Sequence, residues 1–237
     1  MIEIKEAISK KELKQFVKFP FKLYKNSKHW VPPIISEELK TFDKSKNPVF
    51  NDADARFFLA YKNGEIVGRI AAIVNWLEIN NQGIKKMRFG WFDFVDDLEV
   101  SKVLLNTVSE IGKNYKLEYT EGPVGFSNLD KVGVMTDGFD SIAPMITWYN
   151  HPYYVNHYSA HGYTIEKQYS ESCFPFENVK PEFFYKAQNL IKRRYKLKEV
   201  NFTKTSEVMP YADRMFDLFN ESYASLSSFV EITDIQK

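Results

Sequence analysis

The sequence predicts an α/β protein with a mixed central sheet flanked by helices, followed by the first elements of a second, incomplete unit. Residues 87–126 show the pattern of a strand, a helix and a second strand, and residues 56–75 show the pattern of a strand hairpin. The strand-then-helix order of the N-terminus also begins again near residue 197. A strand–helix–strand segment is typical of a parallel crossover and a tight hairpin is antiparallel, so we expect both kinds of pairing in one sheet.

The N-terminal elements are indicated by short local signals. Residues 2–7 alternate in polarity and predict a strand. Ser9 and Glu12 have the spacing of a capping box, so a helix is expected to begin there, and Pro20 is expected to interrupt it. Another short helix is predicted at about residues 36–42.

The hairpin and the strand after it contain many apolar residues. Asn63-Gly64 supplies the positive φ angles that a two-residue hairpin turn needs. Residues 76–83 predict an irregular connection or a short helix. In the strand from residue 87, simple alternation places Phe89, Trp91, Asp93 and Val95 on one face, and Arg88, Gly90, Phe92 and Phe94 on the other.

A helix should follow this strand directly. Asp96 and Glu99 have the spacing of a second capping box. The apolar residues that recur at helical spacing after them are Val100, Val103, Leu104, Val108 and Ile111. Residues 117–126 then return as a strand, and the N-terminus of the crossover helix is a natural position for a phosphate group.

The second half of the chain predicts a long loop and then more elements. A loop as long as residues 127–150 is often functional or lies over a site. The elements expected after it are a helix from Pro152 that closes at Gly162, a strand at 164–176, a helix at 180–195, a strand at 197–204 and a helix at about 206–223. We therefore expect one domain over residues 1–178, and a linker helix with the start of a second unit over 179–237.

Composition excludes several classes of protein. The chain has 237 residues, 44% of them hydrophobic, which is enough for a core. A net charge of +1 argues against a general nucleic-acid or membrane-surface binder, and the basic run at 192–198 is expected to be a solvated helix face. Cys173 is a single cysteine, expected to be a small buried residue rather than a nucleophile. The charged N-terminus and the lack of a long apolar run predict a cytoplasmic protein.

Several motifs together resemble the GNAT superfamily of N-acyltransferases, and more closely bacterial proteins with two GNAT-like domains in tandem. The motifs are HWVPP, NGEIVGRIAAIVN, FGWFDFVDD, EGPVGFS, DGFDSIAPMITWYN and PYYVNHYSAHGY. The resemblance implies acetyl-CoA or another acyl-CoA as co-substrate and an amine of a small molecule or a peptide as acceptor. The partner implied is a second GNAT-like unit or another copy of the chain.

The resemblance also implies site residues. Asn150, Tyr158, Gly162 and Tyr163 match the helix that ends the acyl-CoA site, so Tyr158 would protonate the departing thiolate. A phenol can donate this proton once the charge lies in a dry site. The acyl-CoA would lie against Phe94, Val95, Asp96 and Asn150. The strands at 92–96 and after Tyr119 should separate and leave a cleft beside Tyr158.

Asp93 and Glu121 are candidates for the base that takes the proton of the amine, by position alone. The alternative for both is an ordinary acid that forms a salt bridge or faces solvent. For Tyr158, the alternative is a helix whose aromatic residues only pack against the sheet.

One GNAT motif is missing, and this keeps a second interpretation open. The superfamily places small residues before the crossover helix, where backbone N–H groups approach the CoA pyrophosphate, whereas this chain has Asp96, Asp97 and Glu99 there. These carboxylates would repel a pyrophosphate at short range by more than the helix dipole attracts it. The rival to an enzyme is therefore a catalytically silent GNAT-like domain with a binding or structural role.

Two histidines, His157 and His161, lie four residues apart, with His151 nearby. This spacing could hold zinc, but no third ligand is indicated, so surface histidines and no metal site are expected.

Overall fold

The computed structural model describes residues 1–127, 129–143, 145–226 and 228–237. The described chain forms two compact units. Unit 1 comprises Met1–Tyr163 together with Leu218–Lys237, and unit 2 comprises Thr164–Asp217.

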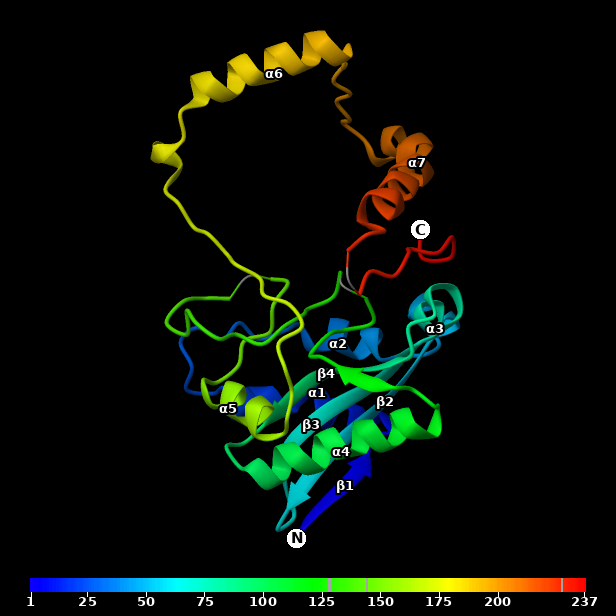
Figure 1. Ribbon diagram of the computed structural model, residues 1–237, viewed down its shortest axis with the longest axis vertical. Helices are drawn as coiled ribbons and strands as arrows, with labels where there is room; N and C mark the ends of the chain where they lie inside the picture. Colours follow the sequence, from blue (N-terminus) through cyan, green and yellow to red (C-terminus); the bar gives the residue numbers. More distant parts are fainter. Residues whose placement is uncertain (128, 144, 227) are drawn as a thin grey trace. The chain divides into compact units, whose positions relative to one another are not determined.

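Unit 1 is built on one five-stranded sheet with the order β1-β2-β3-β4-β5 (Figure 1). The strands are β1 (Ile2–Glu6), β2 (Ala53–Lys62), β3 (Glu65–Asn75), β4 (Lys86–Phe94) and β5 (Tyr119–Glu121). The first four strands pair antiparallel and β4 pairs with β5 in parallel. The predicted α/β class with a mixed sheet is confirmed.

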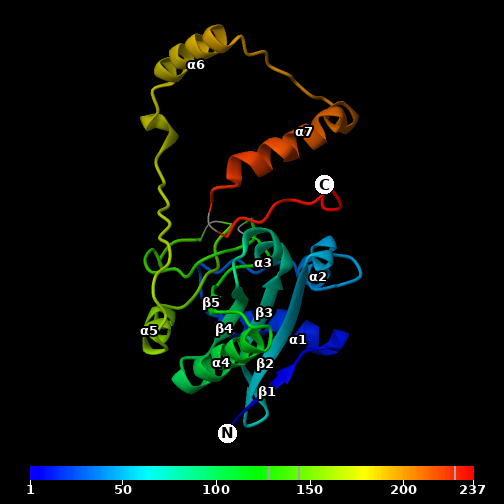
Figure 2. The same cartoon turned by 45° about the vertical axis from the view of Figure 1, so that its right-hand side comes forward.

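Helices cover both faces of this sheet. The helices of the first half are α1 (Lys10–Leu23), α2 (Ile35–Thr41) and the short α3 (Trp76–Gln82), with a 3-10 turn at Pro48–Asn51, and the crossover helix is α4 (Leu98–Asn114). Figures 1 and 2 show α4 on one face and α1 on the other. Two hydrophobic clusters result, one under α4 and one under α1 and α2.

Local signals in the sequence place several of these elements correctly. Ser9 and Glu12 form the expected capping box of α1, although this helix continues through Pro20 rather than ending there. The hairpin turns at Asn63 and Gly64, both with positive φ, between Lys62 and Glu65. These features depend on neighbours in the sequence, which is why local patterns find them.

The predicted faces of β4 are wrong beyond Gly90. Arg69 pairs with Asp93 and Ala71 pairs with Gly90, so two residues of β4 lie opposite Ile70 alone. This β-bulge changes which residues share a face. Phe89 consequently lies in the cluster under α4 with Phe92 and Phe94, whereas Trp91 lies in the opposite cluster.

Trp91 is the residue of the bulge with an unusual backbone conformation. Its φ angle is +44°, a region that bulky residues seldom adopt. Its indole N–H donates to Glu38 at 2.9 Å, and its ring contacts those of Phe42 and Trp148. Packing on the α1 side of the sheet therefore stabilises the bulge.

The predicted cap of α4 is shifted by one residue. Asp97, in an extended conformation, accepts a hydrogen bond from the backbone N–H of Glu99 at 2.9 Å, so Asp97 rather than Asp96 is the N-cap. Asp97 also forms an ion pair with Lys62 at 2.7 Å. Asp96 is left to bind another partner, described below.

The strand predicted at 117–126 is much shorter in the structure. β5 has three residues and ends at Glu121, and Pro123, which lacks a backbone N–H donor, comes two residues later. Gly122 permits a close approach here, because a Cβ at this position would lie 2.4 Å from the carbonyl oxygen of Phe89. The remaining contact is a hydrogen bond from Val124 N to Phe89 O at 2.8 Å.

Unit 2 contains helical residues and extended chain. Its elements are a 3-10 turn at Phe176–Asn178, α6 (Pro181–Tyr195) and most of α7 (Thr205–Tyr223). The strands predicted at 164–176 and 197–204 are wrong, because these described segments have no strand to pair with. Cys173, expected to be buried, is exposed.

The end of the chain packs into unit 1 through a buried group of charges. Arg88 and Lys86 both bind Glu78, at 2.6 and 2.8 Å, and all three side chains are almost completely buried. Arg88 also donates to the carbonyl oxygen of Ser228 at 2.9 Å, and Phe229 is buried beside this group. Residues 228–230 are therefore part of the core of unit 1.

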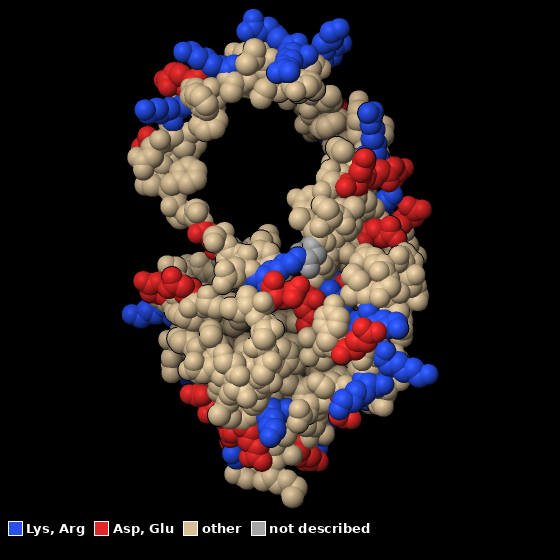
Figure 3. All heavy atoms as spheres, viewed as in Figure 1, with Lys and Arg blue, Asp and Glu red and all other residues tan. Residues whose placement is uncertain are grey.

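Charges of both signs are interspersed over the face of the molecule in Figure 3. In unit 2, the last turn of α6 carries Lys192, Arg193 and Arg194. Among the described residues, no helix is long and apolar enough to span a membrane.

Candidate functional site

The candidate site is a small cavity beside the end of β4, next to the segment that follows β5. The paired register of β4 and β5 ends at Arg88 and Glu121, but Val124 N still donates to Phe89 O at 2.8 Å beyond it, so the predicted separation of the two strands stays a prediction. The cavity has a volume of about 10 Å³, room for roughly one water molecule. It is lined by Phe92, Asp93, Pro123, Gly133, Val134, Trp148, Tyr149, Asn150, Tyr154 and Tyr158. Three residues predicted from the sequence, Asp93, Asn150 and Tyr158, therefore meet at one place.

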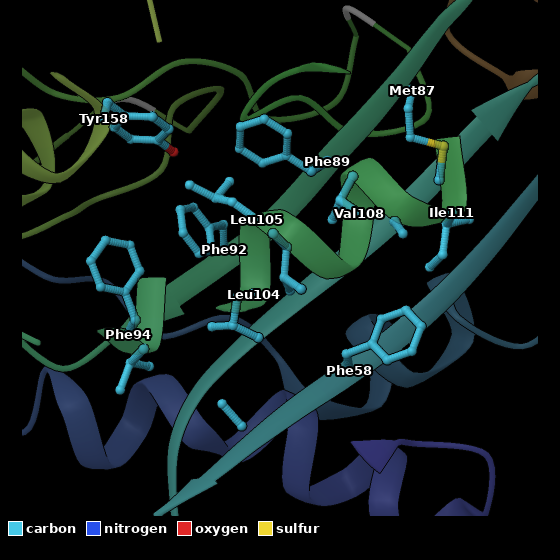
Figure 4. Close-up of a cluster of buried hydrophobic side chains, with 14 of the residues drawn as sticks. Phe58, Met87, Phe89, Phe92, Phe94, Leu104, Leu105, Val108, Ile111 and Tyr158 are labelled. Atoms are coloured by element: carbon cyan, nitrogen blue, oxygen red, sulfur yellow. The ribbon is translucent and has the colours of Figure 1, made fainter. Parts of the chain in front are cut away.

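Tyr158 lies on α5 (Tyr153–Ala160) and points toward the sheet. Its ring packs against Phe89 and Phe92, with ring centroids 6.2 and 5.9 Å apart (Figure 4). Among the described residues, its hydroxyl is the one buried side-chain polar atom with no hydrogen-bond partner. Burial raises the pKa of Tyr158 well above its usual value, with smaller contributions from Tyr163 and Asp93, so the phenol is protonated at neutral pH.

Asp93 belongs to a buried polar network. Its Oδ2 accepts a hydrogen bond from Arg69 Nε at 2.7 Å, and its Oδ1 accepts one from the Tyr24 hydroxyl at 2.7 Å. The Tyr24 hydroxyl lies 2.9 Å from that of Tyr154. Burial and the charge of Asp93 raise the pKa of both tyrosines. Asp93 therefore forms a salt bridge, as in the alternative expectation. Its role as a base stays a prediction.

Glu121 lies outside the lining of the cavity. Its carboxylate binds Lys86 at 3.0 Å and the hydroxyl of Ser228. Burial alone would raise the pKa of Glu121, but the Ser228 hydrogen bond and the charges of Lys86 and Arg88 together lower it. Its predicted role as a base also stays a prediction.

The predicted cofactor-binding residues have partners of their own. The backbone N–H of Phe94 donates to the Tyr154 hydroxyl oxygen at 3.2 Å, and the Tyr153 hydroxyl donates to Phe94 O at 2.5 Å. Val95 N donates to Val67 O at 3.0 Å. These backbone groups are therefore engaged within the protein, on the edge of β4 where an acyl-CoA was expected.

Asn150 ties the long loop to the start of α5. Its Oδ1 accepts from Met135 N at 2.6 Å, and its Nδ2 donates to Met135 O and His151 O at 3.1 and 3.0 Å. All three contacts are to backbone, so Asn150 shapes the wall of the cavity. Contact with a cofactor remains a prediction.

The expectation of surface histidines is wrong for His157, which is almost completely buried. His157 lies 2.9 Å from Asp96 and 2.8 Å from Ser101, which in turn lies 2.7 Å from His161. Sequence reasoning missed this group because Ser101 lies on α4, far along the chain from both histidines. Within the part of the chain that the structure describes, no three His, Cys, Asp or Glu side chains gather as a metal site would need.

A larger groove of about 420 Å³ lies elsewhere, against β1, β2 and α4. Its floor is formed by Ile2, Ile4, Phe58 and Ile111, and none of the predicted site residues lines it. The groove offers apolar surface, whereas the small cavity offers an unpartnered hydroxyl. We therefore take the small cavity as the candidate site.

The fold and site define an α/β protein whose distinctive group is a buried phenol with no hydrogen-bond partner among the described residues. No protein-family model matches the chain. It is 28% identical over 160 residues to Protein YghO of Escherichia coli (strain K12), covering 68% of this chain and 41% of that protein. It is 30% identical over 144 residues to the Bacterial ceramide synthase of Caulobacter vibrioides (strain NA1000 / CB15N), covering 60% and 37%. The chain thus spans about two fifths of the length of these curated relatives.

Solved structures similar to the chain include acetyltransferases. A putative acetyl transferase from Pyrococcus furiosus has 14% identity and a TM-score of 0.43, with 73% of this chain and all of the other covered. A tandem GNAT protein from the clavulanic acid biosynthesis pathway has 10% identity and a TM-score of 0.45, with 68% and 43% covered.

Proposed function

We propose that the protein is an acyl-CoA-dependent N-acyltransferase whose acceptor is a primary amine of a small molecule or a peptide. The observation that carries the proposal is the hydroxyl of Tyr158, which is buried and unpartnered at the small cavity. A buried hydroxyl without a partner costs free energy, about 1–3 kcal/mol, so its retention calls for a use.

In the proposed reaction, the amine nitrogen attacks the thioester carbonyl, a C–N bond forms and the C–S bond breaks. Tyr158, which is protonated at neutral pH, gives its proton to the thiolate as the negative charge develops in the same dry site. The nitrogen loses its proton to Asp93 through a water molecule, because Asp93 lines the same cavity and Glu121 does not. The thioester needs more room than one water, so binding requires movement of the loop or of α5.

Two observations favour the rival role, a GNAT-like domain that binds without catalysis. The cavity is small in this conformation, and Asp96 and Asp97 occupy the start of α4, where they oppose a pyrophosphate. In this second proposal the domain serves a binding or structural role for another unit or another copy of the chain.

The class of acceptor can be narrowed from a relative. One curated relative is named a ceramide synthase, and a ceramide is an N-acylated long-chain amino alcohol. A long-chain amino alcohol is therefore the first acceptor to test, beside short amines and a peptide N-terminus.

The test is a thermal-shift titration with acetyl-CoA and a long-chain acyl-CoA, followed by thiol release with these acceptors. Ligand that binds only the folded state must raise the melting temperature. We expect a rise with at least one acyl-CoA, and in Tyr158→Phe the same rise but about a 10²-fold lower turnover. Absence of any rise at millimolar ligand would sink the enzyme proposal and leave the binding role.

We also propose that residues 179–237 contain the opening elements of a second GNAT-like unit, with α6 as the linker helix, although Leu218–Lys237 belong to unit 1 in this structure. Support comes from the order of the chain, in which α7 follows an extended segment as α1 follows β1. The same titration on a longer form of the chain would show whether a second unit binds acyl-CoA.

A further inference from the structure

A continuous chain of hydrogen bonds joins the start of α4 to the end of α5. The Oγ atom of Ser101, which is fully buried, lies 2.8 Å from Nδ1 of His157 and 2.7 Å from Nε2 of His161. Nε2 of His157 lies 2.9 Å from Oδ1 of Asp96. One serine therefore bridges two imidazoles, and the acid before α4 holds the inner one.

The positions of the protons follow from the partners. The carboxylate of Asp96 accepts, so Nε2 of a neutral His157 carries the hydrogen and Nδ1 accepts from the Ser101 hydroxyl. Ser101 then accepts from Nε2–H of His161, so each of the three hydrogen bonds has one donor and one acceptor. The carbonyl oxygen of Leu98 also lies within reach of the Ser101 hydroxyl, at 3.2 Å. Ser101 can link the two imidazoles because a hydroxyl both donates and accepts.

These hydrogen bonds hold α5, the helix that bears Tyr158. His157 precedes Tyr158 on α5, which has eight residues and no side-chain cap at its N-terminus. The first turn of α5 is tied to Phe94 by the hydroxyls of Tyr153 and Tyr154. The last turn is tied by His157 and His161, while the hydroxyl of Tyr158 has no bond that could hold it.

We propose that Ser101 and His157 are positioning residues, which hold α5 against α4 and thereby hold Tyr158 at the cavity. The catalytic meaning of this role rests on the proposed acyl transfer, whereas the anchoring of α5 does not.

Acid should weaken the anchor. Burial lowers the pKa of His161, and the nearby His157 and Lys102 lower it further. The other titratable groups that face the pair are Asp96, before α4, and Tyr153, on α5. A depressed histidine pKa favours the neutral form in the folded state. The stability that neutral His161 contributes is therefore complete above its unfolded pKa of about 6.5. This stability is lost as pH falls from that value through the lower folded pKa.

The test is amide hydrogen exchange of residues 153–163 in unit 1, measured by mass spectrometry on the full chain. Ser101→Ala leaves two buried imidazole nitrogens without their partner, and Ser109→Ala on the same helix is the matched control. We expect exchange of 153–163 to rise about tenfold or more in Ser101→Ala alone, with residues 103–111 unchanged. Unchanged exchange of 153–163, or an equal rise in both segments, would overturn the proposal.

A second variant keeps the test decisive if Ser101→Ala does not fold. His161→Gln retains an N–H donor toward Ser101 but cannot titrate. We expect exchange of 153–163, corrected for the intrinsic rate, to rise severalfold between pH 7.5 and pH 5.5 in the parent chain and to stay level in His161→Gln. The same rise in both proteins would overturn the role of this histidine. None of these readouts requires acyl transfer, so failure here is distinct from failure of the proposed function.

Discussion

Nε of Arg69 lies 2.7 Å from Oδ2 of Asp93, and both side chains are almost completely buried between the sheet and α1. Arg69 also donates to the carbonyl oxygen of Phe16 at 2.9 Å and lies over the Phe16 ring. The pair therefore links β3, β4 and α1 at the edge of the candidate site.

Removal of one partner should be costly, because it leaves a buried charge alone. We expect Arg69→Met to lower the free energy of unfolding by about 3–5 kcal/mol, measured by urea denaturation. The double variant Arg69→Met/Asp93→Leu should recover part of this loss, since no unpaired charge remains. If the loss of unfolding free energy in the double variant equals the sum of the losses in Arg69→Met and Asp93→Leu, the two residues do not act as a pair.

Tyr158 and Tyr154 allow a matched comparison on one helix. Tyr158→Phe removes a hydroxyl without a partner, so the free energy of unfolding should stay the same or rise by up to about 1 kcal/mol. Tyr154→Phe removes a hydroxyl that binds Tyr24 and Phe94, and should lower the free energy of unfolding by about 1–2 kcal/mol. Chemical denaturation of both variants measures these free energies. Equal losses would show that the Tyr158 hydroxyl has a partner in solution.

Gly90 precedes the bulge and permits close contact with the segment after β5. A Cβ at this position would lie 2.6 Å from the carbonyl oxygen of Val124, and backbone cannot easily give way. We expect Gly90→Ala to lower the melting temperature by several degrees or more, since overpacking costs about 1–3 kcal/mol.

Gly83→Ala is the control for Gly90→Ala. Gly83 has a φ angle of +69° with nothing within 4 Å of an added Cβ, so only backbone strain should appear, about 1 kcal/mol. A smaller loss at Gly90 than at Gly83 would contradict the contact with Val124.

The lowered pKa of Glu121 predicts a dependence of stability on acid. The group contributes stability that is complete above its unfolded pKa, about 4.3, and is lost as pH falls through its lower folded pKa. We expect unfolding free energies of Glu121→Gln to depend less steeply on pH below about 4.5 than those of the parent chain. Denaturant titrations at several pH values give these slopes, and parallel slopes would contradict the assignment.

The sequence by itself determined the elements whose signals are local. The Asn63-Gly64 turn, the Ser9–Glu12 capping box and the helical spacing of α4 each depend on residues a few positions apart. The mixed sheet followed from these, because a hairpin and a crossover leave few ways to pair the strands. The candidate site was found in part, since Asp93, Asn150 and Tyr158 do line one cavity.

Tertiary structure decided what depends on distant partners. The segment at 164–176 was predicted as a strand but is not one, because a strand needs a neighbour for its backbone hydrogen bonds. The bulge beside Trp91 changed the faces of β4, and its cause lies in contacts with Glu38 and Phe42. The environments of Asp93 and His157 were likewise set by Arg69 and Ser101, which are brought close only by folding. Charge and hydrogen bonding act through space, so their effects on a side chain follow from its neighbours in the fold.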